Sequence, residues 1–276
     1  MKISSCYNCE SNRNTFYASE NGFSLVKCDE CGLLFVENRP DQDMITEALK
    51  QGMHSGKRTL NVTGSFNPRK LKYYLNRLDD LFNGDLGGKT TWLDIGCGHG
   101  EFIEAVQKYS SGKIVVTGSE PNVKKQESAR SRGLNVGYYD LESHTEKYDV
   151  ISLMNVYSHI PNPPDFLKLV KKLLKPAGEL ILETGDTSDL TAKQHPRPFI
   201  LPDHLSFASE NIIRDLLGKL DFEILELKKY PFLLRNYVGF AKEATKLLLP
   251  QYISSVKYYF KPVPQTNMYI RAKLIN

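Results

Sequence analysis

Residues 91 to 100 (Thr-Trp-Leu-Asp-Ile-Gly-Cys-Gly-His-Gly) constrain the fold more than any other stretch of the sequence. An apolar run, an acid and then glycines at every second position predict a strand that turns sharply into a helix. Glycine supplies the torsion angles of such a turn and lets backbone N–H groups approach a ligand closely. Asp94, two residues before the first glycine, would repel a pyrophosphate but suits a cationic or zwitterionic ligand. The loop also lacks the wider G-x-x-G spacing of dinucleotide-binding loops.

Two further acids lie at the ends of the next predicted strands. The run 113–120 reads as a strand that ends in Glu120, about twenty residues past the loop, where an acid binds ribose hydroxyls in nucleotide-binding α/β folds. Asp140 lies near the end of the run 135–141 and can face an adenine amino group. Apolar runs at 148–155 and 179–184 predict two more buried strands. Because helical stretches separate these strands, we expect a parallel sheet covered on both faces.

Taken in this order, these segments resemble the class I S-adenosylmethionine-dependent methyltransferases over residues 68–276. The segments that carry the resemblance are Asp94–Gly100, Glu120-Pro121, Tyr148-Asp149 and Leu174–Glu179. The resemblance implies an α/β, Rossmann-like fold with a mainly parallel seven-stranded sheet, and S-adenosylmethionine as the cofactor. The alternative is a Rossmann-like domain that binds another nucleotide.

The same resemblance implies roles for individual residues around the cofactor. Asp94, Gly96 and Gly98 would contact its methionine part. Glu120 would bind the ribose, and Asp140 with Leu141 would border the adenine. The remaining residues expected to lie against the cofactor are Cys97, Pro121 and Asn155.

Four of the five cysteines form two Cys-x2-Cys pairs, Cys6/Cys9 and Cys28/Cys31. Four thiolates in this arrangement can close a tetrahedron around zinc, at about 2.3 Å per bond. A redox pair and two disulfides are the competing interpretations. No signal peptide opens the chain and no apolar run reaches transmembrane length, so we expect a cytoplasmic, reducing setting, which disfavours disulfides. Because cysteine fills all four positions, the zinc would be structural and would supply folding energy to a short segment.

The sequence divides into three expected regions. Residues 28–40 are similar to the zinc-knuckle leader of many bacterial methyltransferases that modify sugars, polysaccharides or secondary metabolites, so we expect a zinc-ribbon-like module at 1–40. Residues 41–67 begin with a predicted helix and continue as a polar, glycine-bearing linker that we expect to cover the cofactor. The methyltransferase domain would occupy 68–276 and begin with an amphipathic helix.

Positive charge gathers near the end of the chain. Residues 228–276 hold nine Lys or Arg and one acid, Glu243, whereas the whole chain has a net charge of +4. Amphipathic helices, broken at Pro250, are predicted between strands at 222–227 and 268–275, and we expect a helical substrate cap at about 231–262. This region could attract a phosphate-bearing substrate, nucleic acid or an anionic membrane surface. A solvated helical face is the alternative.

Two histidines are candidate catalytic residues, because ligands of such sheets bind just beyond the strand ends. His159 follows the strand predicted at 148–155, and His204 lies in a loop after the next strand. Both resemble family positions at the rim of the active site, and we expect His204 to be the base that takes a proton from the acceptor. Related quinone O-methyltransferases carry a Glu-x-x-Glu-His metal site after the fourth strand. This chain has Asn155, Ser158 and His159 there, so we expect no catalytic magnesium.

The sequence thus predicts methyl transfer from S-adenosylmethionine to a small polar acceptor, in the first place a sugar hydroxyl that is nucleotide-linked or part of a polysaccharide precursor. The alternative among enzymes is an RNA methyltransferase that docks through its zinc module, although that module has few paired basic and aromatic residues to stack bases. The alternative from another class is a noncatalytic cofactor-binding or zinc-scaffold protein. The intact Asp94 and Glu120 argue against it.

Overall fold

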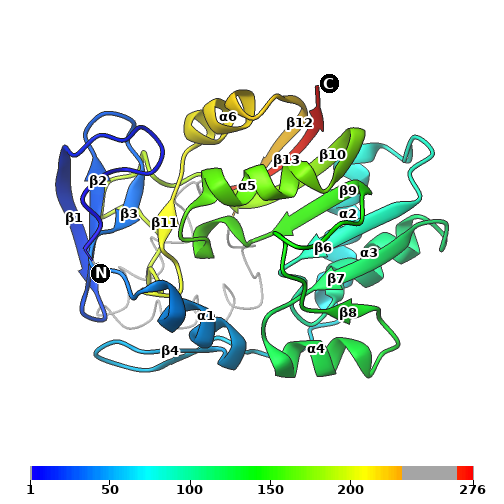
Figure 1. Ribbon diagram of the computed structural model, residues 1–276, viewed down its shortest axis with the longest axis horizontal. Coiled ribbons are helices and arrows are strands. Elements are labelled where there is room, and N and C mark those ends of the chain that lie inside the picture. The colour runs from blue at the N-terminus through cyan, green and yellow to red at the C-terminus, as the bar shows by residue number, and fades with distance from the viewer. Residues whose placement is uncertain (1, 232–265, 276) are drawn as a thin grey trace, which may run out of the picture.

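The computed structural model describes residues 2–231 and 266–275 (Figure 1). Its larger sheet has seven strands in the order β12-β13-β10-β9-β6-β7-β8, and a smaller sheet has four in the order β1-β2-β3-β11. A short hairpin, β4-β5, forms a third sheet. None of the described helices is long and apolar enough to cross a membrane.

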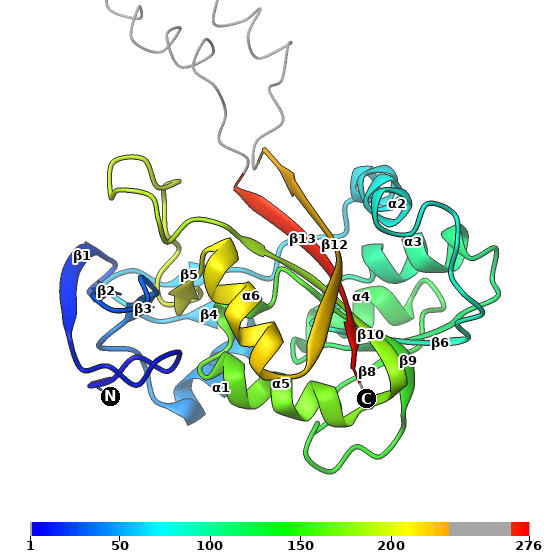
Figure 2. The ribbon, with the colours of Figure 1, turned by 90° about the horizontal axis from the view of Figure 1, so that it is seen from above.

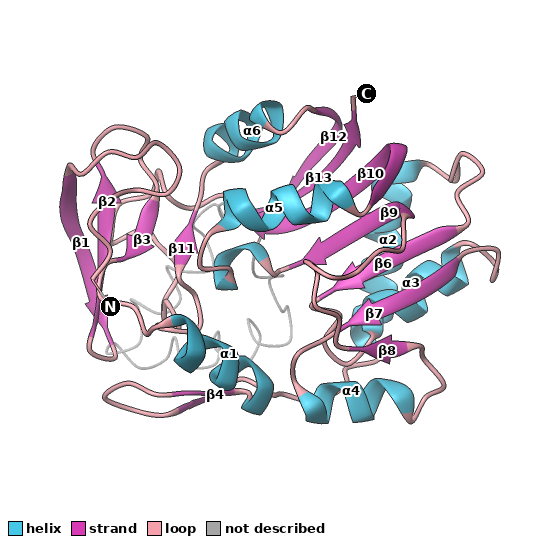
Figure 3. Ribbon diagram, in the orientation of Figure 1, coloured by secondary structure: helices cyan, strands magenta, loops and turns pink. Residues whose placement is uncertain are grey.

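The larger sheet confirms the α/β, Rossmann-like fold with a mainly parallel seven-stranded sheet. Its strands are β6 (Thr91–Ile95), β7 (Val115–Ser119), β8 (Val136–Gly137), β9 (Tyr148–Met154), β10 (Leu174–Gly185), β12 (Phe222–Tyr230) and β13 (Asn267–Leu274). Five strands run parallel, and β13 is antiparallel to both β10 and β12. In Figure 3 the parallel strands end on the side that faces α1 and β4.

Two of the predicted strands differ more than the others from the bounds expected. The strand expected at 135–141 is only β8, because the Tyr139 amide donates to the Ser119 hydroxyl oxygen (3.3 Å) instead of extending the ladder. The strand expected from Glu179 begins earlier, at Leu174. Between Leu174 and Glu179 the ladder of β10 is irregular, and Ala177 there has a φ of 58°.

Helices cover both faces of the larger sheet, as Figure 2 shows. One face packs against α2 (Arg69–Phe82), α3 (Glu101–Tyr109) and α4 (Val123–Arg130), and the other against α5 (Pro163–Lys172) and α6 (Glu210–Lys219). Leu78, Trp92 and Ile103 are fully buried on the first face. Fully burying one such side chain contributes about 1.5–3 kcal/mol. These two cores fix the position of the loops at the carboxyl edge of the sheet.

The smaller sheet joins the N-terminal module to a strand far along the chain. Its strands are β1 (Asn14–Glu20), β2 (Phe23–Cys28), β3 (Leu34–Val36) and β11 (Ser206–Phe207). Ser206 pairs with Phe35 and Phe207 with Leu34, so this sheet crosses the boundary expected at residue 40. The module is therefore built into the rest of the structure.

The segment 41–67 is more ordered than the linker expected there. The predicted helix is confirmed as α1 (Gln42–Gln51), which begins at the N-cap Asp41 and ends at Gly52. The polar stretch after it forms the antiparallel hairpin of β4 (Met53–His54) and β5 (Leu60–Asn61). This segment lies opposite the carboxyl edge of the larger sheet (Figure 1).

Most of the expected cap at 231–262, and most of the basic region, lie outside the described residues. Three of the basic residues of that region that the structure describes are paired with acids: Lys228 Nζ with Glu226 (3.2 Å), Lys229 Nζ with Asp186 (2.6 Å) and Arg271 Nε with Glu179 (2.8 Å). Their charge is therefore largely balanced within the fold.

Candidate active site

A cavity of ≈ 860 Å³ lies at the carboxyl edge of the larger sheet. The ends of β6, β7, β9 and β10 line one side of it, and α1, the residues after β5 and the loop before β11 line the other. All the predicted cofactor-binding and catalytic residues are in its lining: Asp94, Gly96, Cys97, Gly98, Glu120, Pro121, Asp140, Leu141, Asn155, His159 and His204. The fold thus brings the two sets of residues together in one space.

The turn between β6 and α3 needs glycine at three positions. Gly96, Gly98 and Gly100 have φ values of 70°, 58° and 89°, which side chains rarely adopt. A Cβ at Gly96 would lie 2.4 Å from the side chain of Val156, whereas a Cβ at Gly98 would meet nothing within 4 Å. The space at Gly98 therefore belongs to the cavity, and its bare backbone is open to a ligand.

Asp94 is fully buried at the end of β6, and only one of its two carboxylate oxygens has a hydrogen-bond partner in the described part of the chain. Its Oδ1 accepts a hydrogen bond from the Ser152 hydroxyl (2.5 Å), but its Oδ2 has no partner among the described residues. Burial raises the pKa of the Asp94 carboxyl to about 7, and the nearby carboxylates act in the same direction. A positively charged group in the cavity would offset the free-energy cost of burying the charged form of this carboxyl.

Glu120 connects the ends of the two neighbouring strands β6 and β7. Its Oε2 accepts the Gly98 amide (2.8 Å) and its Oε1 accepts the Asn122 amide (2.9 Å). Each carboxylate oxygen retains a further lone pair, so the side chain can still accept hydrogen bonds from two ligand hydroxyls. Glu120 is 4% exposed, which makes it a fixed part of the cavity wall.

Asp140 and Asn155 complete the polar lining on this side. Asp140 is exposed beyond β8, and the Ser143 hydroxyl that donates to its Oδ2 (2.7 Å) lowers the pKa of its carboxyl. Asn155 follows β9 with a φ of 58°, a left-handed conformation that asparagine tolerates better than most residues. Both residues border the cavity together with Leu141.

The two candidate catalytic histidines lie side by side on the other side of the cavity. The ring centroids of His159 and His204 are 4.8 Å apart. Asp203 lies against the first of them: its Oδ1 is 3.2 Å from His159 Nδ1 and 3.0 Å from Nε2 of His54. Three separate parts of the chain therefore converge on one carboxylate.

The two rings differ in their electrostatic setting. Burial opposes the charging of His159, but the Asp203 carboxylate outweighs it and raises the pKa of this imidazole above 6.5. Burial, together with the neighbouring His159, lowers the pKa of His204 to about 4. His204 Nδ1 is buried without a partner among the described residues. His159 is thus the ring that can carry a proton near neutral pH.

The four cysteines also come together, as their spacing predicts. Cys6 Sγ lies 3.5 Å from Cys31 Sγ, and Cys9 Sγ lies 3.5 Å from Cys28 Sγ. All four sulfur atoms lie within 4.8 Å of one another. Four ligands at about 2.3 Å from a tetrahedral zinc ion would be about 3.8 Å apart, so this donor set fits zinc.

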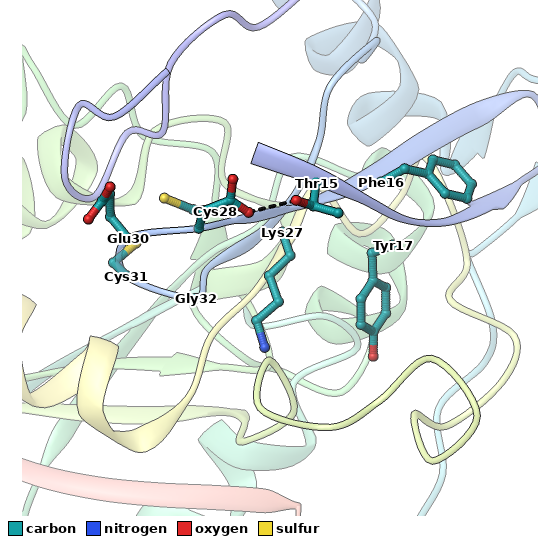
Figure 4. Close-up of a pocket in the computed structure, with 9 residues that line it drawn as sticks. Thr15, Phe16, Tyr17, Lys27, Cys28, Glu30, Cys31 and Gly32 are labelled. Carbon is teal, nitrogen blue, oxygen red and sulfur yellow. Dashed lines mark hydrogen bonds between the residues drawn. The ribbon is translucent and has the colours of Figure 1, made fainter. Parts of the chain in front are cut away.

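Figure 4 shows a shallow hollow beside these cysteines. Thr15, Phe16 and Tyr17 of β1 border it, and the Thr15 hydroxyl donates to Asp29 (2.8 Å). Lys27 reaches away from the sulfur atoms and donates to the backbone carbonyl of Ser188 (2.9 Å). The hollow shares no residue with the cavity described above.

Sequence reasoning missed three acidic or basic side chains of the site. Asp203 directly precedes the candidate base His204, and an acid next to a candidate base could have been recognised from the sequence. His54 lies in the expected linker, and no spacing connected it to the other histidines. Glu183, near the end of β10, accepts the Asn267 amide (2.9 Å), and burial raises the pKa of its carboxyl.

Known sequences that resemble this chain are methyltransferases. Residues 64–227, more than half of the chain, match the family described as a methyltransferase domain. Two relatives named ubiquinone biosynthesis O-methyltransferase are 32% identical over 131 residues (Caulobacter sp. strain K31) and 30% identical over 125 residues (Serratia proteamaculans strain 568). These matches cover 43% of this chain and 52% and 49% of the relatives, so the chain spans about half the length of the curated relatives it matches.

A solved structure shows the same fold. A SAM dependent methyltransferase from Archaeoglobus fulgidus matches with a TM-score of 0.54 and 20% sequence identity. The match covers 75% of this chain and 94% of that protein.

The raised pKa of Asp94 predicts how the stability of the unliganded protein depends on pH. The folded chain keeps this proton up to about pH 7, whereas the unfolded chain releases it near 3.8. The unfolded state therefore binds fewer protons between these values, and the Asp94 contribution should lower the free energy of unfolding as the pH rises through this window. Urea denaturation at several pH values should show a flatter profile for Asp94→Asn. Parallel profiles for the two proteins would contradict the assignment.

Proposed function

The chain belongs to the class I S-adenosylmethionine-dependent methyltransferases, and we propose that it transfers the methyl group of this cofactor to a small polar acceptor. The cavity of ≈ 860 Å³ is the observation that carries the proposal. In it, the acids suited to a nucleoside lie in the same space as a histidine that faces an aspartate. A cofactor and an acceptor could therefore meet there.

The cofactor would be held by residues at the ends of β6, β7 and β8. Asp94 would face the positively charged methionine part, because its Oδ2 has no partner within residues 2–231 and 266–275. Gly96 and Gly98 would let that part approach the backbone, and Glu120 would accept the ribose hydroxyls. The remaining residues proposed to border the cofactor are Cys97, Pro121, Asp140, Leu141 and Asn155, of which Asp140 and Leu141 would face the adenine.

When bound, S-adenosylmethionine supplies a methyl group on a sulfonium, which is a good leaving group. A hydroxyl acceptor must lose its proton, and we assign this proton to His159. Its Nδ1 lies against Asp203, so Nε2 remains to accept the proton, and the carboxylate stabilises the charged ring. His204 was the base expected from the sequence, but its pKa of about 4 makes it a weak proton acceptor. Its role would be to pack beside His159 and line the acceptor side.

We propose a sugar hydroxyl as the acceptor, nucleotide-linked or in a polysaccharide precursor. The names of the relatives support oxygen as the acceptor atom. The sugar itself is carried over from the sequence-based expectation. RNA methylation is less favoured, since Lys228, Lys229 and Arg271 are paired with acids. The cytoplasm is the proposed location, because it keeps thiols reduced.

The cofactor assignment can be tested by calorimetry with S-adenosylhomocysteine, the demethylated form of the cofactor. The protein should bind it with a Kd on the order of micromolar. Glu120→Ala should weaken binding by roughly tenfold or more, because hydrogen bonds to a charged group are lost, and Asp94→Ala should abolish it. Glu127→Ala, which removes an exposed carboxylate of α4, is the matched control and should bind like the wild type. Unchanged heats of binding in both cavity variants would refute the assignment.

We also propose that Cys6, Cys9, Cys28 and Cys31 bind one structural zinc ion. Metal analysis should find about one zinc per chain, and the double variant Cys28→Ser/Cys31→Ser should contain almost none and should unfold at a lower temperature. Cys97→Ser serves as the control, because Cys97 lines the cavity and should not alter the zinc content. A zinc-free protein with an equally protected N-terminal module would contradict the structural role.

The choice of base requires an acceptor, which a screen of nucleotide sugars with radiolabelled S-adenosylmethionine can identify. With it, His159→Ala should lower kcat by about 10²–10⁴-fold while the affinity for S-adenosylhomocysteine stays near wild type. The wild-type rate should rise with pH through a pKa above 6.5, and this rise should be absent in the variant.

His204→Ala is the matched variant for this experiment, and its effect on kcat should be smaller. A silent His159→Ala with an inactive His204→Ala would reverse the two roles. Full activity in both variants would mean that transfer needs no protein base, as for an amine or carbon nucleophile.

A further inference from the structure

The loop of residues 199–205 carries Asp203 and His204, and the cysteine-bearing module contacts it at both ends. At its start, the Glu20 carboxylate accepts three successive amides, those of Phe199 (2.8 Å), Ile200 (2.6 Å) and Leu201 (3.1 Å). Glu20 is the last residue of β1. Three bonds from N–H groups to one carboxylate are charge-assisted and fix the direction of this backbone.

At its other end, the loop passes into the sheet of the module. The Val36 amide donates to the Leu205 carbonyl (2.9 Å), and β11 then pairs with β3. Between the two ends, Phe199 and Leu201 are fully buried in a core that they share with Leu25 and other residues of the module. The loop is therefore packed against the module along its length.

The backbone at the centre of the Glu20 contact is strained. Ile200 has a φ of 65°, which is unfavourable for a β-branched residue. Such a conformation persists only where its surroundings impose it. The amide of Ile200 makes the shortest of the three bonds to Glu20, so this carboxylate is the group placed to impose it.

The strained residue also sets the turn that presents Asp203 and His204. The Ile200 carbonyl accepts the amides of Asp203 (2.9 Å) and His204 (3.1 Å). Directly after this turn, the Leu205 amide donates to the Ser158 carbonyl (2.7 Å), next to His159. A shift at Ile200 would thus move Asp203 relative to the ring whose charge it stabilises.

We propose that Glu20 is a positioning residue for methyl transfer and that the cysteine-bearing module builds the acceptor half of the active site. The inference rests on the proposed function, because it assigns the loop a part in proton removal. It gives the module a role other than docking nucleic acid. The folded module holds Asp203 in place beside His159 through the three backbone amides that Glu20 binds.

The first test measures hydrogen exchange by mass spectrometry in the zinc-loaded, full-length protein. Glu20→Gln keeps the size of the side chain but removes its charge and places an NH₂ group among the amides. The amides of residues 199–201 should then exchange about ten- to a hundredfold faster. Glu37→Gln is the matched control, because this carboxylate of the module pairs with Lys2 (3.2 Å) and with no other basic residue in the part of the chain that the structure describes. It should leave the loop unchanged, and the exchange of β6 should stay the same in both variants.

The second test asks whether Glu20 positions Asp203 beside His159 or only stabilises the loop. The His159 ring is surrounded by Asp203 and His204 of the loop, by His54 of β4 through their shared carboxylate, and by the charge of Lys125. Following its ring protons by NMR across pH should give a lower pKa in Glu20→Gln than in wild type or Glu37→Gln, because the contact with Asp203 weakens. S-adenosylhomocysteine should bind all three proteins equally.

Two results would overturn the proposal: unchanged exchange of the loop in Glu20→Gln, or faster exchange with an unchanged His159 pKa. If Glu20→Gln does not fold, Asn21→Asp replaces it, since this change substitutes a negatively charged oxygen for the side-chain NH₂ that donates to the backbone carbonyls of Leu201 (3.1 Å) and Arg58 (2.9 Å). It should produce the same two changes, and their absence would again refute the proposal. Failure of the wild type to bind S-adenosylhomocysteine would instead refute the proposed function.

Discussion

A buried chain of hydrogen bonds connects the core of the larger sheet to its functional edge. The Trp92 indole donates to the Ser152 hydroxyl (2.9 Å), which donates in turn to Asp94 (2.5 Å). All three residues are 0% exposed. Because buried hydrogen bonds hold side chains in place, this chain fixes the orientation of Asp94, which borders the cavity and whose Oδ2 has no partner among the described residues. The glycine turn and Glu120 are then arranged around that carboxylate.

The two halves of the cavity are built in different ways. In the half with Asp94, Glu120 and Asp140, Asp94 lies near the end of strand β6 and the other two acids lie in loops after β7 and β8, so each residue is placed by a parallel strand. The residues of the half with the histidines are not all placed by strands of the larger sheet. They come from β4, the turn after β9 and the loop before β11, and a single carboxylate, Asp203, links them. This half therefore depends on contacts between distant parts of the chain.

Those contacts explain why a small cysteine-bearing module is built into the fold. A segment of this size buries little apolar surface by itself, and a metal bound by four thiolates would supply the missing folding energy. Once folded, the module shares a strand ladder and an apolar core with the loop that carries Asp203. Folding of the module around the cysteines thus stabilises the loop that carries Asp203. The four cysteines themselves are not among the described residues that line the cavity.

Local sequence patterns were enough to predict the fold and the side of the cavity at the ends of β6, β7 and β8. Alternating glycines after an acid permit only a narrow range of turns, and parallel strands bring their carboxyl ends to one edge, so Asp94, Gly98, Glu120 and Asp140 could be placed from local patterns. The cysteine spacing determined the cluster of four sulfur atoms in the same way. The side of the cavity that holds the histidines could be seen only in the folded chain. Glu20, His54, His159 and Asp203 lie far apart in the chain, and their meeting depends on long-range pairing such as β3 with β11, which no local periodicity encodes.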